Sequence, residues 1–117
     1  MARPAGPYTP VVRAGDWLLV SGQVGSKDGA LVGGGVAAQL HQAVANLCQL
    51  LQQHGATLAD VVKTGVFMVD ISQFAAMNEA YAEAFGEHRP ARTTIGVAGL
   101  PLGAAVEIDA WAFRPVQ

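Results

Sequence analysis

Charge is scarce in this sequence, and the scarcity disfavours several classes of partner. Only 14% of the 117 residues are charged, whereas soluble domains carry about 25% charged residues. Seven Lys and Arg residues are scattered among nine Asp and Glu residues, which gives a net charge of -2 and no basic stripe for a phosphate backbone. We therefore expect no nucleic-acid partner. Because 51% of the residues are hydrophobic, we do expect an apolar face that a homo-oligomer hides.

Cysteine and long apolar runs are also rare. The single Cys48 excludes a disulfide within the chain, and its neighbours Leu47 and Leu51 indicate a small buried hydrophobic residue rather than a reactive thiol. No segment approaches the ~20 apolar residues of a membrane span, and the first ten residues lack the apolar run of a signal peptide. We expect a cytoplasmic protein that does not contact membranes.

Motifs that would hold a metal, a nucleotide or a catalytic triad are missing as well. The histidines, His41, His54 and His88, have no metal-ligand spacing, and neither a P-loop nor a G-x-G-x-x-G pattern occurs. Ser21 lies outside any G-x-S-x-G motif and has no His and Asp partners in the order of a hydrolase triad. We expect no bound metal and no cofactor.

Turn residues and hydrophobic periodicity divide the chain into elements of a single domain, residues 1–117. Apolar residues recur every three or four positions over 36–51 and again over 74–85, which predicts two amphipathic helices. Gly55 is the predicted stop of the first helix, Ser72 the predicted cap of the second, and Pro90 ends the second helix. The predicted strands are residues 11–13, 17–22, 61–69, 92–97 and 106–113, with turns at 14–16, 27–29 and 100–103.

The order β-β-α-β-α-β-β predicts an α+β fold in which two helices cover one face of a sheet. The last strand shows which residues point to each face, because side chains alternate along a strand. Its aliphatic residues at 106, 108, 110 and 112 suit the helix-covered face, so Glu107 points toward solvent or a partner subunit. A carboxylate beside Trp111 and Phe113 on a face that an oligomer closes is a candidate site residue. The alternative is an ordinary exposed strand glutamate.

Polar residues at strand starts and ends complete the set of candidates, and each alone also fits a surface or turn position. They gain meaning because short motifs along the whole chain resemble the Rid family of reactive intermediate deaminases, also known as YjgF-like proteins. The motifs are Gly6-Pro7-Tyr8, Ser21-Gly22-Gln23, Ala38-Gln39, Val62-Lys63-Thr64, Val69-Asp70, Phe74 with Asn78 and Tyr81, Pro90-Ala91-Arg92, Leu100-Pro101 and Val106-Glu107-Ile108.

The resemblance implies a chorismate-mutase-like subunit, a barrel-shaped homotrimer and pockets between the subunits. It implies that Arg92 grips the carboxylate of a substrate and that Glu107 handles water and protons. Similar enzymes hydrolyse enamines and imines such as 2-aminoacrylate and 2-iminopropanoate to 2-keto acids and ammonia, without a cofactor. Further residues match positions that line the pocket: Tyr8, Ser21, Gly22, Asn78 and Thr94.

Two departures from the family pattern bear on the substrate. Archetypal members carry Arg-Ser-Cys where this chain has Arg92-Thr93-Thr94, so a hydroxyl replaces a pocket thiol, and the segment 81–90 is shorter. Two other functions remain open at this point. One is a non-catalytic trimer that binds small carboxylates and regulates amino-acid metabolism, and the other is an endoribonuclease, which the acidic balance disfavours.

Overall fold

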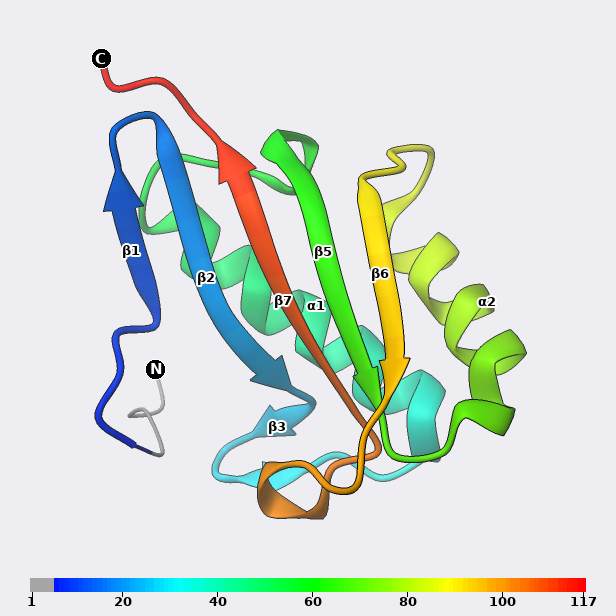
Figure 1. The fold of residues 1–117 in the computed structure, drawn as a ribbon. Coiled ribbons are helices and arrows are strands. Elements are labelled where there is room, and N and C mark those ends of the chain that lie inside the picture. The colour runs from blue at the N-terminus through cyan, green and yellow to red at the C-terminus, as the bar shows by residue number, and fades with distance from the viewer. Residues whose placement is uncertain (1–5) are drawn as a thin grey trace.

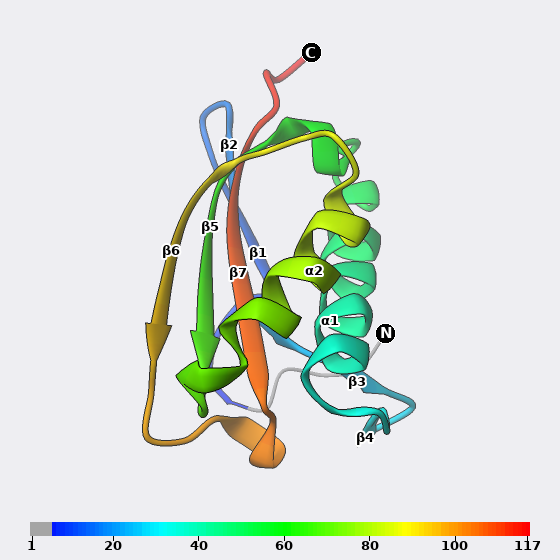
Figure 2. The same ribbon diagram turned by 90° about the vertical axis from the view of Figure 1, so that its right-hand side faces the viewer.

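The computed structural model describes residues 6–117 as a five-stranded sheet with two helices packed on one of its faces (Figures 1 and 2). The predicted α+β class is therefore confirmed. The elements are β1 (Val11–Ala14), β2 (Trp17–Val24), β3 (Ser26–Lys27), β4 (Ala30–Leu31), α1 (Gly35–Gln52), β5 (Val61–Met68), α2 (Phe74–Phe85), β6 (Ala91–Gly96) and β7 (Val106–Phe113).

The sheet has the strand order β1-β2-β7-β5-β6, so the last strand of the chain lies at its centre. β7 pairs antiparallel with both β2 and β5, whereas β6 pairs parallel with β5. A parallel pair needs a crossover connection, and α2 provides it. The turn predicted at residues 27–29 joins β3 and β4, which form a separate two-stranded sheet.

The hydrophobic core lies between the sheet and the helices. The four aliphatic residues of β7 are fully buried, and α1 contributes Leu40, Leu47 and Leu51, each with no exposed surface. Each fully buried leucine stabilises the fold by about 1.5–3 kcal/mol. The alternation predicted for β7 is thus confirmed, and it places Glu107 on the face away from the helices.

That second face of the sheet is apolar, and among residues 6–117 no helix covers it (Figure 2). Val12, Trp17, Trp111 and Phe113 have exposed fractions between 39% and 50%. The rings of Trp17 and Phe113 meet edge to face, with their centroids 5.1 Å apart. We refer to these four residues as the uncovered face.

Two local predictions were wrong. Ser72 does not cap α2: Asp70 accepts a hydrogen bond from the Ser72 backbone N–H at 3.0 Å and caps a short 3-10 helix, Ile71–Gln73, that precedes α2. A carboxylate accepts backbone N–H groups more strongly than a hydroxyl, which explains the difference. Cys48 is half-buried rather than part of the core, and its partial burial raises the pKa of its thiol.

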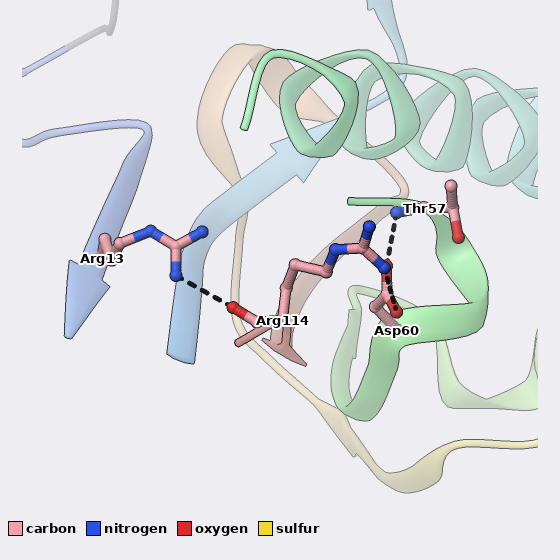
Figure 3. A network of polar contacts seen from close by, with 4 residues as sticks. All are labelled: Arg13, Thr57, Asp60 and Arg114. Atoms are coloured by element: carbon pink, nitrogen blue, oxygen red, sulfur yellow. Dashed lines mark hydrogen bonds and ion pairs between the residues drawn. The ribbon is translucent and has the colours of Figure 1, made fainter. Parts of the chain in front are cut away.

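Polar contacts fasten the end of β7 to distant parts of the chain (Figure 3). Arg13 Nη1 donates to the Arg114 carbonyl at 3.0 Å, and the Arg114 guanidinium lies 3.7 Å from Asp60. Asp60 also accepts the Thr57 backbone N–H at 2.9 Å. These contacts hold the central strand in register at one end. Within residues 6–117, no helix is long and apolar enough to cross a membrane.

Candidate active site

Glu107 lies against the backbone of β2, at a bulge between Val20 and Gln23. A Cβ atom at Gly22 would sit only 2.7 Å from both Cδ and Oε1 of Glu107. Only glycine therefore lets the carboxyl group pack this close to the strand. The bulge also carries β2 past Gly22, where the sequence predicted its end, to Val24.

Glu107 shares one cavity of about 1230 Å³ with three other predicted site residues, Tyr8, Ser21 and Gly22. Ser21 holds the N-terminal segment in place, because its Oγ donates to the Thr9 carbonyl at 2.7 Å. Four of the seven predicted site residues therefore come together at the junction of β2, β7 and the segment before β1.

The electrostatic surroundings of Glu107 favour its protonated form. Burial raises the pKa of Glu107 above its ordinary value, and the neighbouring carboxylate of Asp109 raises it further. Asp109 accepts the Gly65 N–H at 2.8 Å, yet burial also raises its pKa. A carboxyl with a raised pKa exchanges protons more readily near neutral pH, as a general acid or base requires.

Arg92 lies elsewhere, on the face of the sheet that carries α2. In the parallel pairing of β5 and β6, Arg92 is the register partner of Thr64, so both side chains point to the same face. The Thr64 side chain is fully buried beneath the helices. The guanidinium carbon of Arg92 is 4.8 Å from the ring centroid of Tyr81 and 5.5 Å from that of Phe74, and Nη1 is 3.8 Å from the Met77 sulfur. Within residues 6–117, no carboxylate lies at ion-pair distance from this half-buried cation.

Two polar atoms near Arg92 also lack partners. Thr94 is two residues further along β6, and Asn78 follows Met77 on α2. In the described part of the chain, Asn78 Oδ1 and Thr94 Oγ1 are buried and make no hydrogen bond. Buried polar atoms nearly always have partners, so these two are candidates to contact a bound molecule.

The predicted site residues therefore form two separate groups in one subunit. The first group, Tyr8, Ser21, Gly22 and Glu107, lines the cavity beside β2. The second group, Asn78, Arg92 and Thr94, lies between β6 and α2 and lines no part of that cavity. Arg92 and Glu107 project from opposite faces of the sheet, so one copy of the chain does not bring them together.

Sequence reasoning missed the aromatic surroundings of Arg92. Phe74, Met77 and Tyr81 were assigned to the apolar stripe of α2, and Phe74 and Tyr81 also to a family motif, but none was predicted to contact the guanidinium, as all three do. The tyrosine within an otherwise apolar stripe was the available signal, since a buried hydroxyl needs a hydrogen-bond partner. Among the described residues, no group of three or more His, Cys, Asp or Glu side chains could hold a metal ion.

Comparison with known proteins shows the family to which the chain belongs. Residues 1–114 match the family described as Endoribonuclease L-PSP. A RutC family protein of Pyrococcus horikoshii is 40% identical over 114 residues, which cover 96% of this chain and 90% of that protein. The human 2-iminobutanoate/2-iminopropanoate deaminase is 40% identical over 111 residues, which cover 93% of this chain and 81% of the human protein.

Solved structures show the same fold. The crystal structure of RidA from an Antarctic Psychrobacter species superposes with a TM-score of 0.90 at 34% identity, covering 95% of this chain and 91% of that one. A Mycobacterium tuberculosis member of the YjgF/YER057c/UK114 family superposes with a TM-score of 0.80 at 39% identity, covering 91% and 86%. The chain belongs to the L-PSP family, which includes the YjgF and RidA proteins, and the predicted family is confirmed.

Proposed function

We propose that this protein is a cofactor-independent deaminase that hydrolyses 2-imino and enamino acids, such as 2-iminopropanoate, to 2-keto acids and ammonia. The observation that carries the proposal is Arg92, a half-buried guanidinium with no anionic partner in residues 6–117. Its neighbours Asn78 and Thr94 offer buried polar atoms that also lack partners. The human relative, a 2-iminobutanoate/2-iminopropanoate deaminase, supports the same substrate class.

The complete site, in this proposal, forms between subunits of a homotrimer. One copy supplies Asn78, Arg92 and Thr94, and its neighbour supplies Tyr8, Ser21, Gly22 and Glu107. The apolar uncovered face supports association, because exposed apolar patches of this kind usually mark interfaces. The opposite orientations of Arg92 and Glu107 support a shared site, since one copy alone does not bring them together.

Arg92 would bind the carboxylate common to all these substrates. A planar guanidinium donates two parallel hydrogen bonds to a carboxylate, each charge-assisted and contributing about 1.5–3 kcal/mol. A lysine cannot copy that geometry. The unpaired Thr94 hydroxyl could donate to the carboxylate of the bound acid, and the unpaired Asn78 amide oxygen could accept from its imine N–H.

Glu107 would move the protons of the hydrolysis. Water attacks the electrophilic imine carbon while the Glu107 carboxylate accepts one of its protons. Glu107 then gives this proton to the nitrogen, which yields a carbinolamine. In a second transfer Glu107 accepts the hydroxyl proton of the carbinolamine and delivers it to the nitrogen, so that the C–N bond breaks, ammonia leaves and the carbonyl of the 2-keto acid forms. The raised pKa of Glu107 suits a group that must both accept and donate a proton.

Variants of the two residues test the proposal. We expect Arg92→Lys to lose most imine hydrolysis and Arg92→Ala nearly all of it, because each loses the bidentate contact. Glu107→Gln should still bind pyruvate but hydrolyse the imine about 10²–10⁴-fold more slowly, the usual contribution of general acid-base catalysis. The measurement is the half-life of imines generated in the assay from several amino acids, together with pyruvate affinity.

Arg13→Ala is the matched control: it removes an exposed arginine at the opposite edge of the sheet, so it should lower stability through the lost Arg114 contact and leave imine hydrolysis unchanged. Full activity in Arg92→Ala would defeat the site assignment. If the protein is instead a carboxylate-binding regulatory protein, wild type and Glu107→Gln should bind pyruvate equally well. Neither should then shorten the imine half-life. An endoribonuclease would cleave RNA and bind it with an affinity that falls steeply with salt.

A further inference from the structure

A buried pair of hydroxyl groups connects the sheet to α2 next to Arg92, on the neighbouring strand β5. The Thr64 Oγ1 and Tyr81 Oη atoms are 2.8 Å apart, and the side chains are 0% and 5% exposed. Burying a hydroxyl is unfavourable unless it is hydrogen-bonded, so each residue satisfies the other. Phenylalanine at position 81 and valine at position 64 would fill the same space. Packing alone therefore does not explain why both residues carry a hydroxyl group.

The tyrosine ring contacts both the phenylalanine at the end of α2 and the arginine on β6. Tyr81 stacks on Phe85 with ring centroids 4.5 Å apart and an angle of 25° between the planes. Arg92 lies on Tyr81 at 4.8 Å, within the range of a cation–π contact. Burial raises the pKa of Tyr81, although the Thr64 hydrogen bond and the charges of Arg92 and Arg89 oppose the rise. The phenol is therefore neutral at physiological pH.

We propose that Tyr81 and Thr64 are positioning residues for Arg92. Their hydrogen bond fixes the Tyr81 ring as a platform, and the platform restrains the guanidinium against α2, where Nη1 also lies 3.8 Å from the Met77 sulfur. A long side chain with no ion-pair partner would otherwise sample several rotamers, and binding a carboxylate would then have to order it. That the ligand is a carboxylate rests on the proposed function, whereas the restraint on the Arg92 side chain does not.

The first experiment follows the guanidinium itself. In isotope-labelled protein, the Nε–Hε NMR signal of Arg92 is identified by its loss in Arg92→Lys, and its relaxation reports how ordered the side chain is. We expect an ordered signal in wild type and in Thr64→Ser, which keeps the hydroxyl. The order should fall in Thr64→Val and Tyr81→Phe, and further in Tyr81→Leu.

Ala76→Gly is the control for general loosening of α2, because Ala76 is exposed on that helix. It should lower stability and leave the Arg92 signal unchanged. An equally ordered Arg92 signal in wild type, Thr64→Val and Tyr81→Phe would overturn the inference. This readout is independent of catalysis, so it decides the positioning role even if the protein hydrolyses no imine.

The second experiment is a double-mutant cycle on pyruvate affinity. Thr64→Val should weaken binding about 2–30-fold in the wild-type background, the range that a cation–π contact can account for. In an Arg92→Ala background the same substitution should cause no further loss, because Tyr81 and Thr64 act through Arg92. An equal loss in both backgrounds would show a merely structural role. Wild-type protein without imine hydrolysis or pyruvate binding would instead refute the proposed function alone.

Discussion

At the scale of single residues, Glu107 combines a role in the proposed chemistry with a cost in stability. Its carboxyl is packed against Gly22 and lies near the carboxylate of Asp109, and both burial and Asp109 raise its pKa. The folded protein therefore holds a proton on Glu107 more tightly than the unfolded chain does. Ionised Glu107 lowers the free energy of unfolding at neutral pH, whereas below about pH 4 the carboxyl is protonated in both states and the cost disappears.

The substitution Glu107→Gln should thus abolish most activity and yet stabilise the protein at about pH 7. The gain should be less than about 1 kcal/mol, because the carboxyl is half-exposed and solvent screens it. Urea unfolding at equal protein concentration should show the gain near pH 7 and its loss near pH 4. Glu79→Gln, an exposed position on α2, serves as the control. A Glu107→Gln variant less stable than wild type at neutral pH would contradict this origin of the raised pKa.

At the scale of elements, the bulge in β2 builds the cavity. A regular strand would carry its alternation through residues 21 and 22, whereas the bulge shifts the register between Val20 and Gln23 and turns Gly22 toward Glu107. Bulges often occur next to active sites, where they redirect the chain. The position of this carboxyl is therefore a property of two neighbouring strands together.

We expect Gly22→Ala to displace the Glu107 carboxyl, because the new methyl would lie 2.7 Å from its Cδ. Misplacing a catalytic group by about 1 Å can cost up to about 10²-fold in rate, so imine hydrolysis should fall toward that extent. Gly33→Ala is the matched control, since its Cβ would meet no atom within 4 Å. Steady-state rates with melting temperatures would check the prediction. Equal rates for the two variants would show that the Gly22 contact is unimportant.

At the scale of the whole molecule, the proposed function would make assembly a condition for activity, because one copy of the chain keeps Arg92 and Glu107 apart. We expect light scattering to give three times the 12.1 kDa subunit mass. Trp111→Lys, which places a charge on the uncovered face, should yield an inactive monomer, whereas Val116→Lys near the exposed C-terminus should remain trimeric and active. A stable wild-type monomer at micromolar concentration would defeat both the trimer and the shared site.

Trimers assembled from two different variants extend the same prediction. Arg92→Ala and Glu107→Gln should each be nearly inactive alone, but their mixed trimers contain clefts in which both wild-type residues meet. Random assembly of an equal mixture should restore about one quarter of the clefts. Refolding the two variants together and measuring imine half-life would detect this recovery. No recovery in confirmed mixed trimers would place Arg92 and Glu107 of one chain in the same cleft.

The sequence by itself determined the two helices, the five strands of the main sheet and the buried face of β7, whereas the short strands β3 and β4 were predicted only as a turn. Those properties depend on local periodicity, and the burial of Val106, Ile108 and Ala110 followed directly from it. For most strands and helices, the predicted ends lie within about two residues of the observed ends. This is expected, because capping contacts decide where an element begins and ends. One example is the start of α2: Ser72 was the predicted cap, but Asp70 caps the short 3-10 helix that precedes α2.

Only the tertiary structure decided what the site residues contact. Alternation along β6 assigns Arg92 to a face, but the parallel pairing with β5 and the packing of α2 bring Tyr81, Met77 and Phe74 around it. Likewise, the close approach of Gly22 to Glu107 depends on the register of β2 with β7. Such contacts join residues distant in sequence, and their geometry is set by strand order and helix packing, which local patterns of hydrophobicity do not encode.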